Sequence, residues 1–374
     1  MPQLNQQDRR YLDAALRLAR KHQGLTGTNP SVACIIVKDL GNGPLIIGSA
    51  VTAKGGRPHA EPPALEEAGE GAQGATAYVT LEPCSHHGKT PPCAQTLIDA
   101  GIARVVTAIL DPDHRVNGLG HKMLEAANVV VTKMDGGEGV ARVMQGYLKV
   151  RTDNMPFVTL KLAMTPEGLI GEKAVGNLRI SGDVSNRQTH LSRARHDCIL
   201  VGSNTASADD PMLTCRLAGM EGRSPVRVIL DAKCTITAQY KLIGTAREVP
   251  TIVVSPATSP TQWLEMLTRN GVTHLPCELH NGRIALPELF EDLAARGLHS
   301  IMVEAGAKLS DSLLKEQLVD EIIIHVAGKP IFLRSPEDGI YAGFTPSQLP
   351  IGFEVRQELR FGDDTALRLR KISV

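Results

Sequence analysis

Four residues in the first quarter of the chain have the types and spacing of a hydrolytic metal centre. His59 and Glu61 belong to a His-Ala-Glu triplet, Cys84 follows Pro83, and Cys93 comes further along the chain. Zinc prefers nitrogen and sulfur ligands, and a catalytic zinc keeps one of its four positions open for water, whose pKa it lowers towards ~7. We therefore predict Zn²⁺ bound by one histidine and two cysteines, with Glu61 as the catalytic residue that moves protons.

Three short elements must place these side chains at one point. The histidine and the glutamate open a predicted helix over 61–69, and the first cysteine follows a predicted strand over 75–81. The second cysteine stands in the first turn of a predicted helix over 91–101. Because helix N-termini carry a partial positive charge, they favour a thiolate at that place.

The spacing resembles the signature of zinc deaminases, His-x-Glu…Pro-Cys-x-x-Cys, in which activated water replaces an amino group. Here a longer segment, 85–92, separates the two cysteines. A structural zinc site is the alternative interpretation, and it would need a fourth protein ligand such as His86 or His87. The other five cysteines lie in or beside apolar runs, as small core residues do.

The bulk composition limits the class of protein. The chain has 374 residues, 42 % hydrophobic and only 3 % aromatic, which predicts two or three globular domains with mostly aliphatic cores. The 40 basic and 40 acidic residues cancel, so no net charge attracts a nucleic acid or a membrane. An odd number of cysteines argues against a disulfide framework, and the first residues do not form a signal peptide. We expect a cytoplasmic protein that acts on a small molecule.

Helical and strand patterns alternate along the chain, which is typical of α/β domains. We place the boundary before Pro156, so that a domain over 1–152 precedes a domain over 153–374. In the first domain we expect helices at 5–22, 61–69, 91–101, 119–127 and 137–151, and strands at 32–38, 44–51, 75–81, 103–110 and 128–132. In the second we expect strands at 157–164, 197–202, 226–231, 251–255, 300–306, 321–327, 353–359 and 366–372, and helices at 183–195, 260–270, 286–296 and 308–317.

The segment that carries the cysteines also resembles a known family. TLEPCSHHGKTPPC over 80–93, together with Asn29-Pro30 and LDPD over 110–113, is similar to the deaminase half of the bifunctional riboflavin-biosynthesis deaminase/reductases. The resemblance implies an N-terminal α/β/α sandwich like that of cytidine deaminases. It also implies Zn²⁺-dependent hydrolytic deamination of 2,5-diamino-6-ribosylamino-4(3H)-pyrimidinone 5′-phosphate.

The resemblance continues through the second half of the chain. KLAM over 161–164, GSNTASADDPMLTCR over 202–216 and VEAG over 303–306 are similar to the reductase half of the same family. They imply a C-terminal α/β domain like dihydrofolate reductase, which uses NADPH to reduce the ribosyl chain to ribityl. The family resemblance also implies a homo-oligomer.

The resemblance implies roles for individual residues. The substrate-side positions are Asn29, His86, Lys89, Asn177, Arg193, Leu213, Arg216 and Glu304. The cofactor-side positions are Ala163, Arg179, Thr205, Asp209 and Gly306. Arginine suits a phosphate because its guanidinium binds in a bidentate manner. A turn over 202–205 would offer backbone N–H groups to the cofactor. Without the resemblance, the histidines and the lysine of 86–89 would be interpreted as a solvated loop.

Several positions depart from the family pattern. Thr165-Pro166-Glu167-Gly168 replaces a usual Ser-Leu-Asp-Gly, Arg179 replaces a tryptophan, and Thr52 replaces a histidine. None of these changes affects the predicted zinc ligands. Two alternatives therefore stay open for the protein. One is a deaminase with a degenerate, non-reducing second domain, and the other is a nucleic-acid deaminase, which the neutral charge and scarce aromatics disfavour.

Overall fold

The computed structural model describes residues 6–88, 90–134, 138–173 and 178–372. The chain divides into two compact units, Met1–Asn154 and Met155–Val374, so the division lies two residues beyond the boundary that the sequence suggests. No helix in the described segments is long and apolar enough to cross a membrane. Each unit contains its own sheet and its own hydrophobic core, as expected for two α/β domains.

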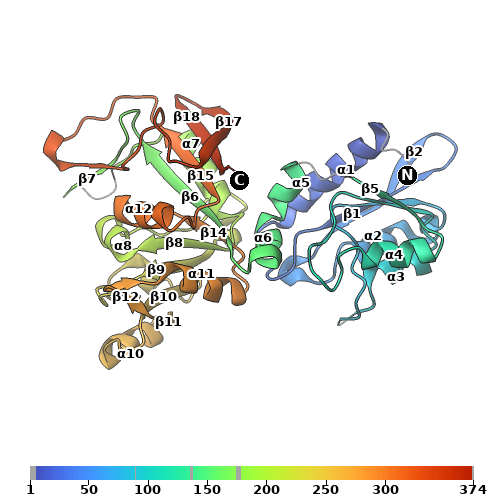
Figure 1. The fold of residues 1–374 in the computed structure, drawn as a ribbon, viewed down its shortest axis with the longest axis horizontal. Helices are drawn as coiled ribbons and strands as arrows, with labels where there is room; N and C mark the ends of the chain where they lie inside the picture. Colours follow the sequence, from blue (N-terminus) through green and yellow to red (C-terminus); the bar gives the residue numbers. More distant parts are fainter. Residues whose placement is uncertain (1–5, 89, 135–137, 174–177, 373–374) are drawn as a thin grey trace. The chain divides into compact units, whose positions relative to one another are not determined.

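The first unit is built on a five-stranded mixed sheet with the order β2-β1-β3-β4-β5 (Figure 1). The first two strands form an antiparallel hairpin around Gly41-Asn42-Gly43, as predicted, and β3 pairs antiparallel with β1. The last three strands are parallel to one another. The bounds of the strands are β1 Ala33–Asp39, β2 Pro44–Val51, β3 Thr76–Val79, β4 Arg104–Thr107 and β5 Val130–Lys133.

Helices cover both faces of this sheet, which gives the predicted sandwich (Figure 1). α1 and α5 pack together on one face, while α2, α3 and α4 form a continuous layer on the other. The helices are α1 Gln6–Ala19, α2 Glu61–Ala68, α3 Cys93–Asp99, α4 Leu119–Ala126, α5 Glu138–Val143 and α6 Gln145–Asp153. The prediction of one helix over 137–151 is wrong, because the chain leaves helical geometry at the buried Met144.

The core of the first unit is mostly aliphatic, in agreement with the composition. The helical spacing of Leu12, Ala15, Leu16 and Ala19 on α1 buries all four against the sheet. On β1, every residue from Ala33 to Val37 is buried, because helices lie against both faces. A buried leucine or isoleucine contributes about 1.5–3 kcal/mol, so these contacts hold the elements that carry the functional residues.

The second unit has a nine-stranded sheet with the order β11-β10-β9-β8-β14-β6-β15-β18-β17 (Figure 1). The strands from β11 to β15 are parallel, and the C-terminal pair β17 and β18 is antiparallel. Their bounds are β6 Phe157–Met164, β8 Cys198–Gly202, β9 Val226–Leu230, β10 Thr251–Pro256, β11 Thr273–Cys277, β14 Ser300–Val303, β15 Glu321–Val326, β17 Phe353–Phe361 and β18 Asp364–Lys371.

Smaller elements complete the second unit. Two short antiparallel pairs, β12–β13 and β16–β7, were not predicted from the sequence. The expected turn over 202–205 is instead the start of a helix, α8, for which Gly202 is the N-cap. The bounds of these short strands and of the helices of the second unit are β7 Leu169–Glu172, α7 Asp183–Arg193, α8 Ser203–Asp209, α9 Lys241–Gly244, α10 Thr261–Arg269, β12 Leu279–His280, β13 Arg283–Ile284, α11 Leu286–Ala295, α12 Ala307–Lys315 and β16 Gly339–Tyr341.

Candidate functional site

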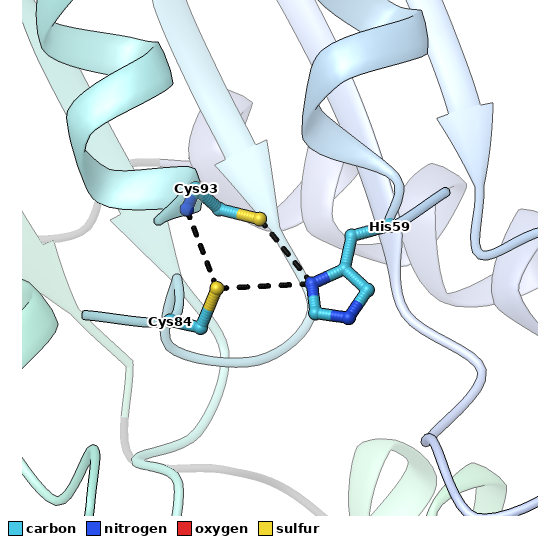
Figure 2. Close-up of side chains that lie close together, drawn as sticks. All are labelled: His59, Cys84 and Cys93. Atoms are coloured by element: carbon cyan, nitrogen blue, oxygen red, sulfur yellow. Dashed lines mark hydrogen bonds between the residues drawn. The ribbon is translucent and has the colours of Figure 1, made fainter. Parts of the chain in front are cut away.

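The three predicted metal ligands lie together in the structure, as Figure 2 shows. His59 Nδ1 is 3.3 Å from Cys93 Sγ and 3.7 Å from Cys84 Sγ. The histidine comes just before α2, Cys84 lies in the loop after β3, and Cys93 is the first residue of α3. The ends of three elements therefore bring two sulfurs and one nitrogen to a single point.

This donor set fits a zinc ion. Zinc–nitrogen and zinc–sulfur bonds of ~2.0 and ~2.3 Å place the two ligand atoms about 3.5 Å apart around a tetrahedral ion. The observed separations of 3.3 and 3.7 Å lie on either side of that value. Among the described residues, the cluster contains only the histidine and the two cysteines, and neither His86 nor His87 joins it. Three ligands fit a catalytic site with an open position better than a closed structural site.

Hydrogen bonds within the cluster favour a thiolate at Cys84. The backbone N–H of Cys93 donates to Cys84 Sγ over 3.3 Å (Figure 2). Hydrogen bonding from the Cys93 side chain lowers the pKa of Cys84 to about 4, helped by His59 and opposed by burial. Because Cys93 gives its hydrogen to Cys84, the pKa of the Cys93 thiol is raised, and burial raises it further. The thiolate is the form of cysteine that binds a metal, so the lowered pKa makes Cys84 a suitable ligand.

Glu61 lies beside the cluster and is only 3 % exposed. It lines one pocket with His59 and Cys84. Burial raises the pKa of its carboxyl, and the neighbouring Cys84 raises it further. The structure therefore places a carboxyl group next to the three ligand atoms without including it in the cluster that they form.

Two of the predicted substrate-side residues line the same pocket, namely Asn29 and His86. The Asn29 amide donates from Nδ2 to the carbonyl oxygen of Gly56 over 3.1 Å. A Cβ at position 56 would lie 2.5 Å from that nitrogen, so glycine leaves room for the amide. The buried Nδ1 atom of His86 has no hydrogen-bond partner among the described residues. Lys89, the third residue predicted from this loop, lies outside the described residues.

A network of charged groups forms another wall of the pocket. The Tyr147 hydroxyl donates to both carboxylate oxygens of Asp111, at 3.0 and 3.1 Å. Asp113 accepts from Arg115 Nε at 2.9 Å and Nη2 at 2.6 Å, and Arg151 Nε lies 3.4 Å away. The bond from Arg115 holds the pKa of Asp113 well below its usual range, although burial opposes it. All five residues line the pocket, so its wall is polar and largely pre-ordered.

Glu82 connects this wall to the segment that carries the cysteines. Its buried carboxylate accepts the backbone N–H groups of Asp111 at 3.3 Å, Gly118 at 2.9 Å and His121 at 3.2 Å. A Cβ at Gly120 would lie 2.0 Å from the Pro83 carbonyl oxygen, so the start of α4 approaches this segment closely. Because Glu82 stands two residues before Cys84, these bonds set the pocket wall relative to the metal ligands.

In the second unit, Arg193 and Glu304 form a two-pronged ion pair. Arg193 donates from Nε and Nη2 to the two Glu304 oxygens, at 2.7 and 2.8 Å, and from Nη1 to the Thr214 carbonyl oxygen. Burial alone would raise the pKa of Glu304, but the adjacent guanidinium lowers it to about 2. Arg216 Nη1 donates to Thr214 Oγ1, and His190 Nδ1 lies 2.9 Å from the Thr214 carbonyl oxygen. Three predicted substrate-side residues therefore gather around one loop.

Two further titratable groups belong to this part of the second unit. Lys161 lies on β6, where burial lowers the pKa of its ammonium group while Glu304 opposes that shift. His325 lies on the neighbouring strand β15 and is 2 % exposed. Burial, and then the positive charge of Lys161, lowers the pKa of His325 to about 3, so its imidazole is neutral. Neither residue is among the substrate-side or cofactor-side positions predicted from the sequence.

The predicted cofactor-side residues Thr205 and Gly306 meet at the carboxyl ends of two adjacent parallel strands, β8 and β14. A Cβ at Gly306 would lie 3.6 Å from Thr205 Oγ1, and α8 and α12 begin directly after these strands. Open α/β sheets bind nucleotides at such edges. The hydroxyl, the small residue and the backbone N–H groups of the first helical turns fit the pyrophosphate of NADPH. Asp209 ends the same helix α8 and is half-buried.

The remaining predicted residues of the second unit have mixed environments. Ala163 is half-buried on β6, opposite His325. Leu213 is buried and has a positive φ of 52°, which is unusual for a residue with a side chain. Arg179 is exposed, and its guanidinium pairs with Asp183 on α7. Asn177 lies outside the described residues.

Sequence reasoning did not assign several residues that line the first pocket. These are Arg57, Glu82, Arg115, Tyr147 and Arg151. The aspartates between them belong to the LDPD motif, which the sequence does reveal. Arg57 and Glu82 each stand two residues before a ligand, His59 and Cys84, which is a signal that the sequence does offer. Arg115, Tyr147 and Arg151 come from segments far from the ligands, so only the folded unit brings them to the pocket.

The domains match known sequence families in the order that the fold suggests. Residues 5–109 match the family described as the cytidine and deoxycytidylate deaminase zinc-binding region, and residues 156–333 match the RibD C-terminal domain. The chain is 39 % identical to riboflavin biosynthesis protein RibD of Haemophilus influenzae over 344 residues, which is 88 % of each chain. It is 36 % identical to RibD of Escherichia coli over 334 residues, 86 % of this chain and 88 % of that one.

Solved structures show the same similarity. Acinetobacter baumannii RibD, form 2, superposes with a TM-score of 0.82 and 33 % identity, covering 98 % of this chain and 99 % of the other. A Thermotoga maritima diaminohydroxyphosphoribosylaminopyrimidine deaminase/5-amino-6-(5-phosphoribosylamino)uracil reductase has a TM-score of 0.82 and 29 % identity, covering 97 % and 98 %. The chain therefore belongs to the RibD family of riboflavin biosynthesis enzymes, with a zinc-binding deaminase domain followed by an NADPH-using reductase domain.

Proposed function

We propose that this enzyme converts 2,5-diamino-6-ribosylamino-4(3H)-pyrimidinone 5′-phosphate in two steps, first by hydrolytic deamination and then by reduction of the ribosyl chain to ribityl. The observation that carries the first step is the three-ligand cluster with Glu61 buried beside it in one pocket. The solved Thermotoga maritima relative is titled as an enzyme with this pair of activities. The nearly complete coverage of both chains supports extending the pair of activities to this one.

In the deamination step, His59, Cys84 and Cys93 hold the zinc, which when bound makes water a nucleophile at neutral pH. Glu61 accepts a proton from the attacking water and returns it to the departing amine, so that water is consumed and ammonia leaves. Asn29 and His86 contact the substrate from the pocket wall. The pocket is lined by both hydrogen-bond donors and acceptors, which suits a pyrimidine with amino and carbonyl groups on its rim.

In the reduction step, Arg193, Arg216 and Glu304 bind the substrate around the Thr214 loop. Thr205 and Gly306 hold the pyrophosphate of NADPH, which supplies the hydride when it is bound. The ion pair between Arg193 and Glu304 keeps the carboxylate ionised and fixes both side chains before the substrate arrives. Fixed donors of this kind bind a ligand at a lower entropic cost than mobile ones.

The test is an assay of the full-length enzyme with the diaminopyrimidine ribotide, with and without NADPH, beside a metal analysis. We expect close to one zinc per chain, release of ammonia without NADPH, and NADPH oxidation only after deamination. Ammonia release without any NADPH oxidation or binding would support the alternative of a degenerate second domain. A salt-sensitive mobility shift with tRNA would support the alternative of a nucleic-acid deaminase.

We also propose a homo-oligomer with a cytoplasmic location. The edge strand β17 supports an oligomer, because Val355 and Leu359 on it are more than a third exposed and its outer edge pairs with no other strand described here. Light scattering on the purified enzyme would measure the number of chains, and a monomer at micromolar concentration would refute this proposal.

A further inference from the structure

Three arginines line the deaminase pocket, and they differ in whether a carboxylate lies close to the guanidinium. Arg115 and Arg151 both lie against Asp113, at 2.6 Å and 3.4 Å. Arg57 is the third, and no carboxylate among the described residues lies within ion-pair distance of it. Within the described residues, the pocket thus contains one guanidinium with no carboxylate paired to it.

The fold holds this guanidinium in place. Arg57 Nη1 donates to the Thr90 hydroxyl over 2.9 Å. A Cβ at Gly88 would lie 3.2 Å from Nη2, so the side chain packs against the loop between the two cysteine ligands. His86, on the same loop, has a buried Nδ1 atom without a partner among the described residues. A fixed cation and an unpartnered imidazole nitrogen that line the same pocket are suited to binding an anion.

We propose that Arg57 binds the 5′-phosphate of the substrate during deamination and thereby makes the deaminase selective for ribotides over ribosides. This inference rests on the proposed function, because the ribotide carries the only phosphate that the first step presents. Guanidinium binds phosphate in a bidentate manner, and Arg57 uses only one of its five N–H groups in the hydrogen bonds of the described structure. Arg115 and Arg151 are less suited to this role because Asp113 would repel a phosphate beside them.

The experiment compares the ribotide with its dephosphorylated riboside on three forms of the full-length, zinc-loaded enzyme. These are the wild type, Arg57→Met, and Arg10→Met, in which an exposed arginine on α1 is changed in the same way. We expect Arg57→Met to lower kcat/KM for the ribotide by about 10- to 100-fold, the size of a lost charged hydrogen-bond pair. The kcat/KM for the riboside should change less than about threefold, because the riboside has no phosphate whose contact could be lost. Arg10→Met should leave both values unchanged.

Two further measurements separate phosphate binding from a structural role. Arg57→Lys keeps the charge and should recover part of the preference for the ribotide, and zinc content should be unchanged in every variant. An equal loss for both substrates, or a loss of zinc, would show that Arg57 supports the loop or the metal site and would overturn the inference. An unchanged ribotide preference in Arg57→Met, or in Arg57→Gln if the methionine variant does not fold, would also overturn it. A wild type that deaminates neither compound would refute the proposed function itself.

Discussion

The ion pair between Arg193 and Glu304 predicts a stability that depends on pH. The adjacent guanidinium lowers the pKa of Glu304 to about 2, against 4.5 for an ordinary glutamate. This difference corresponds to about 3 kcal/mol of folding free energy. Because the folded-state pKa is the lower one, the contribution is complete well above pH 4.5 and is lost as the pH falls towards 2. About half of it should remain near pH 3.

The Glu304→Gln variant tests this contribution. It keeps the shape of the side chain but leaves Arg193 beside a neutral amide, so the free energy of unfolding at pH 7 should fall by about 3 kcal/mol. Urea unfolding followed by tryptophan fluorescence reports on the second unit alone, because Trp263 on α10 is the only tryptophan in the chain. The control is Glu354→Gln, which removes an exposed ion pair with Arg356 and should cost less than about 1 kcal/mol.

The pH dependence decides whether the reasoning holds. The difference between wild type and Glu304→Gln should be largest at pH 7 and should shrink steadily below about pH 4.5. A difference below about 1 kcal/mol at pH 7 would show that the partly buried pair does not stabilise the domain. A difference that is the same at pH 7 and pH 3.5 would show that the loss comes from packing and not from the charge of Glu304.

Three more changes have defined outcomes. Glu61→Gln should retain zinc but lower the rate of deamination by about 10²-fold or more, since proton transfer is lost while the ligands remain; near-normal turnover with a full zinc content would refute that role. Cys84→Ser should lower zinc content and the rate of deamination. The affinity for NADPH, measured by titration, should stay near that of the wild type, because Cys84 lies in the first unit and the predicted NADPH site lies in the second. Arg227→Met should destabilise the second unit by about 3 kcal/mol or more in the same urea assay, because this fully buried guanidinium donates to five oxygen atoms that would lose this donor; a loss below about 1 kcal/mol would contradict this reasoning.

Local periodicity predicted most elements but missed those that depend on distant partners. The apolar spacing of 5–22 and the mostly apolar run of 157–164 each match an observed element closely. Helix α8, in contrast, contains one buried residue and no apolar stripe, so its sequence looked like a turn. Strand β7 exists because it pairs with β16, far along the chain, and no local pattern encodes that pairing.

The types and spacing of His59, Glu61, Cys84 and Cys93 by themselves determined the metal chemistry, because few other functions need that set of residues. What only the tertiary structure decided is the charge balance around them. Asp113 pairs with Arg115 and Arg151, whereas no carboxylate among the described residues lies within ion-pair distance of Arg57. Ion pairing depends on distances of a few ångströms between side chains, and the sequence places these far apart. Folding therefore determines which of several similar cations is available to a substrate.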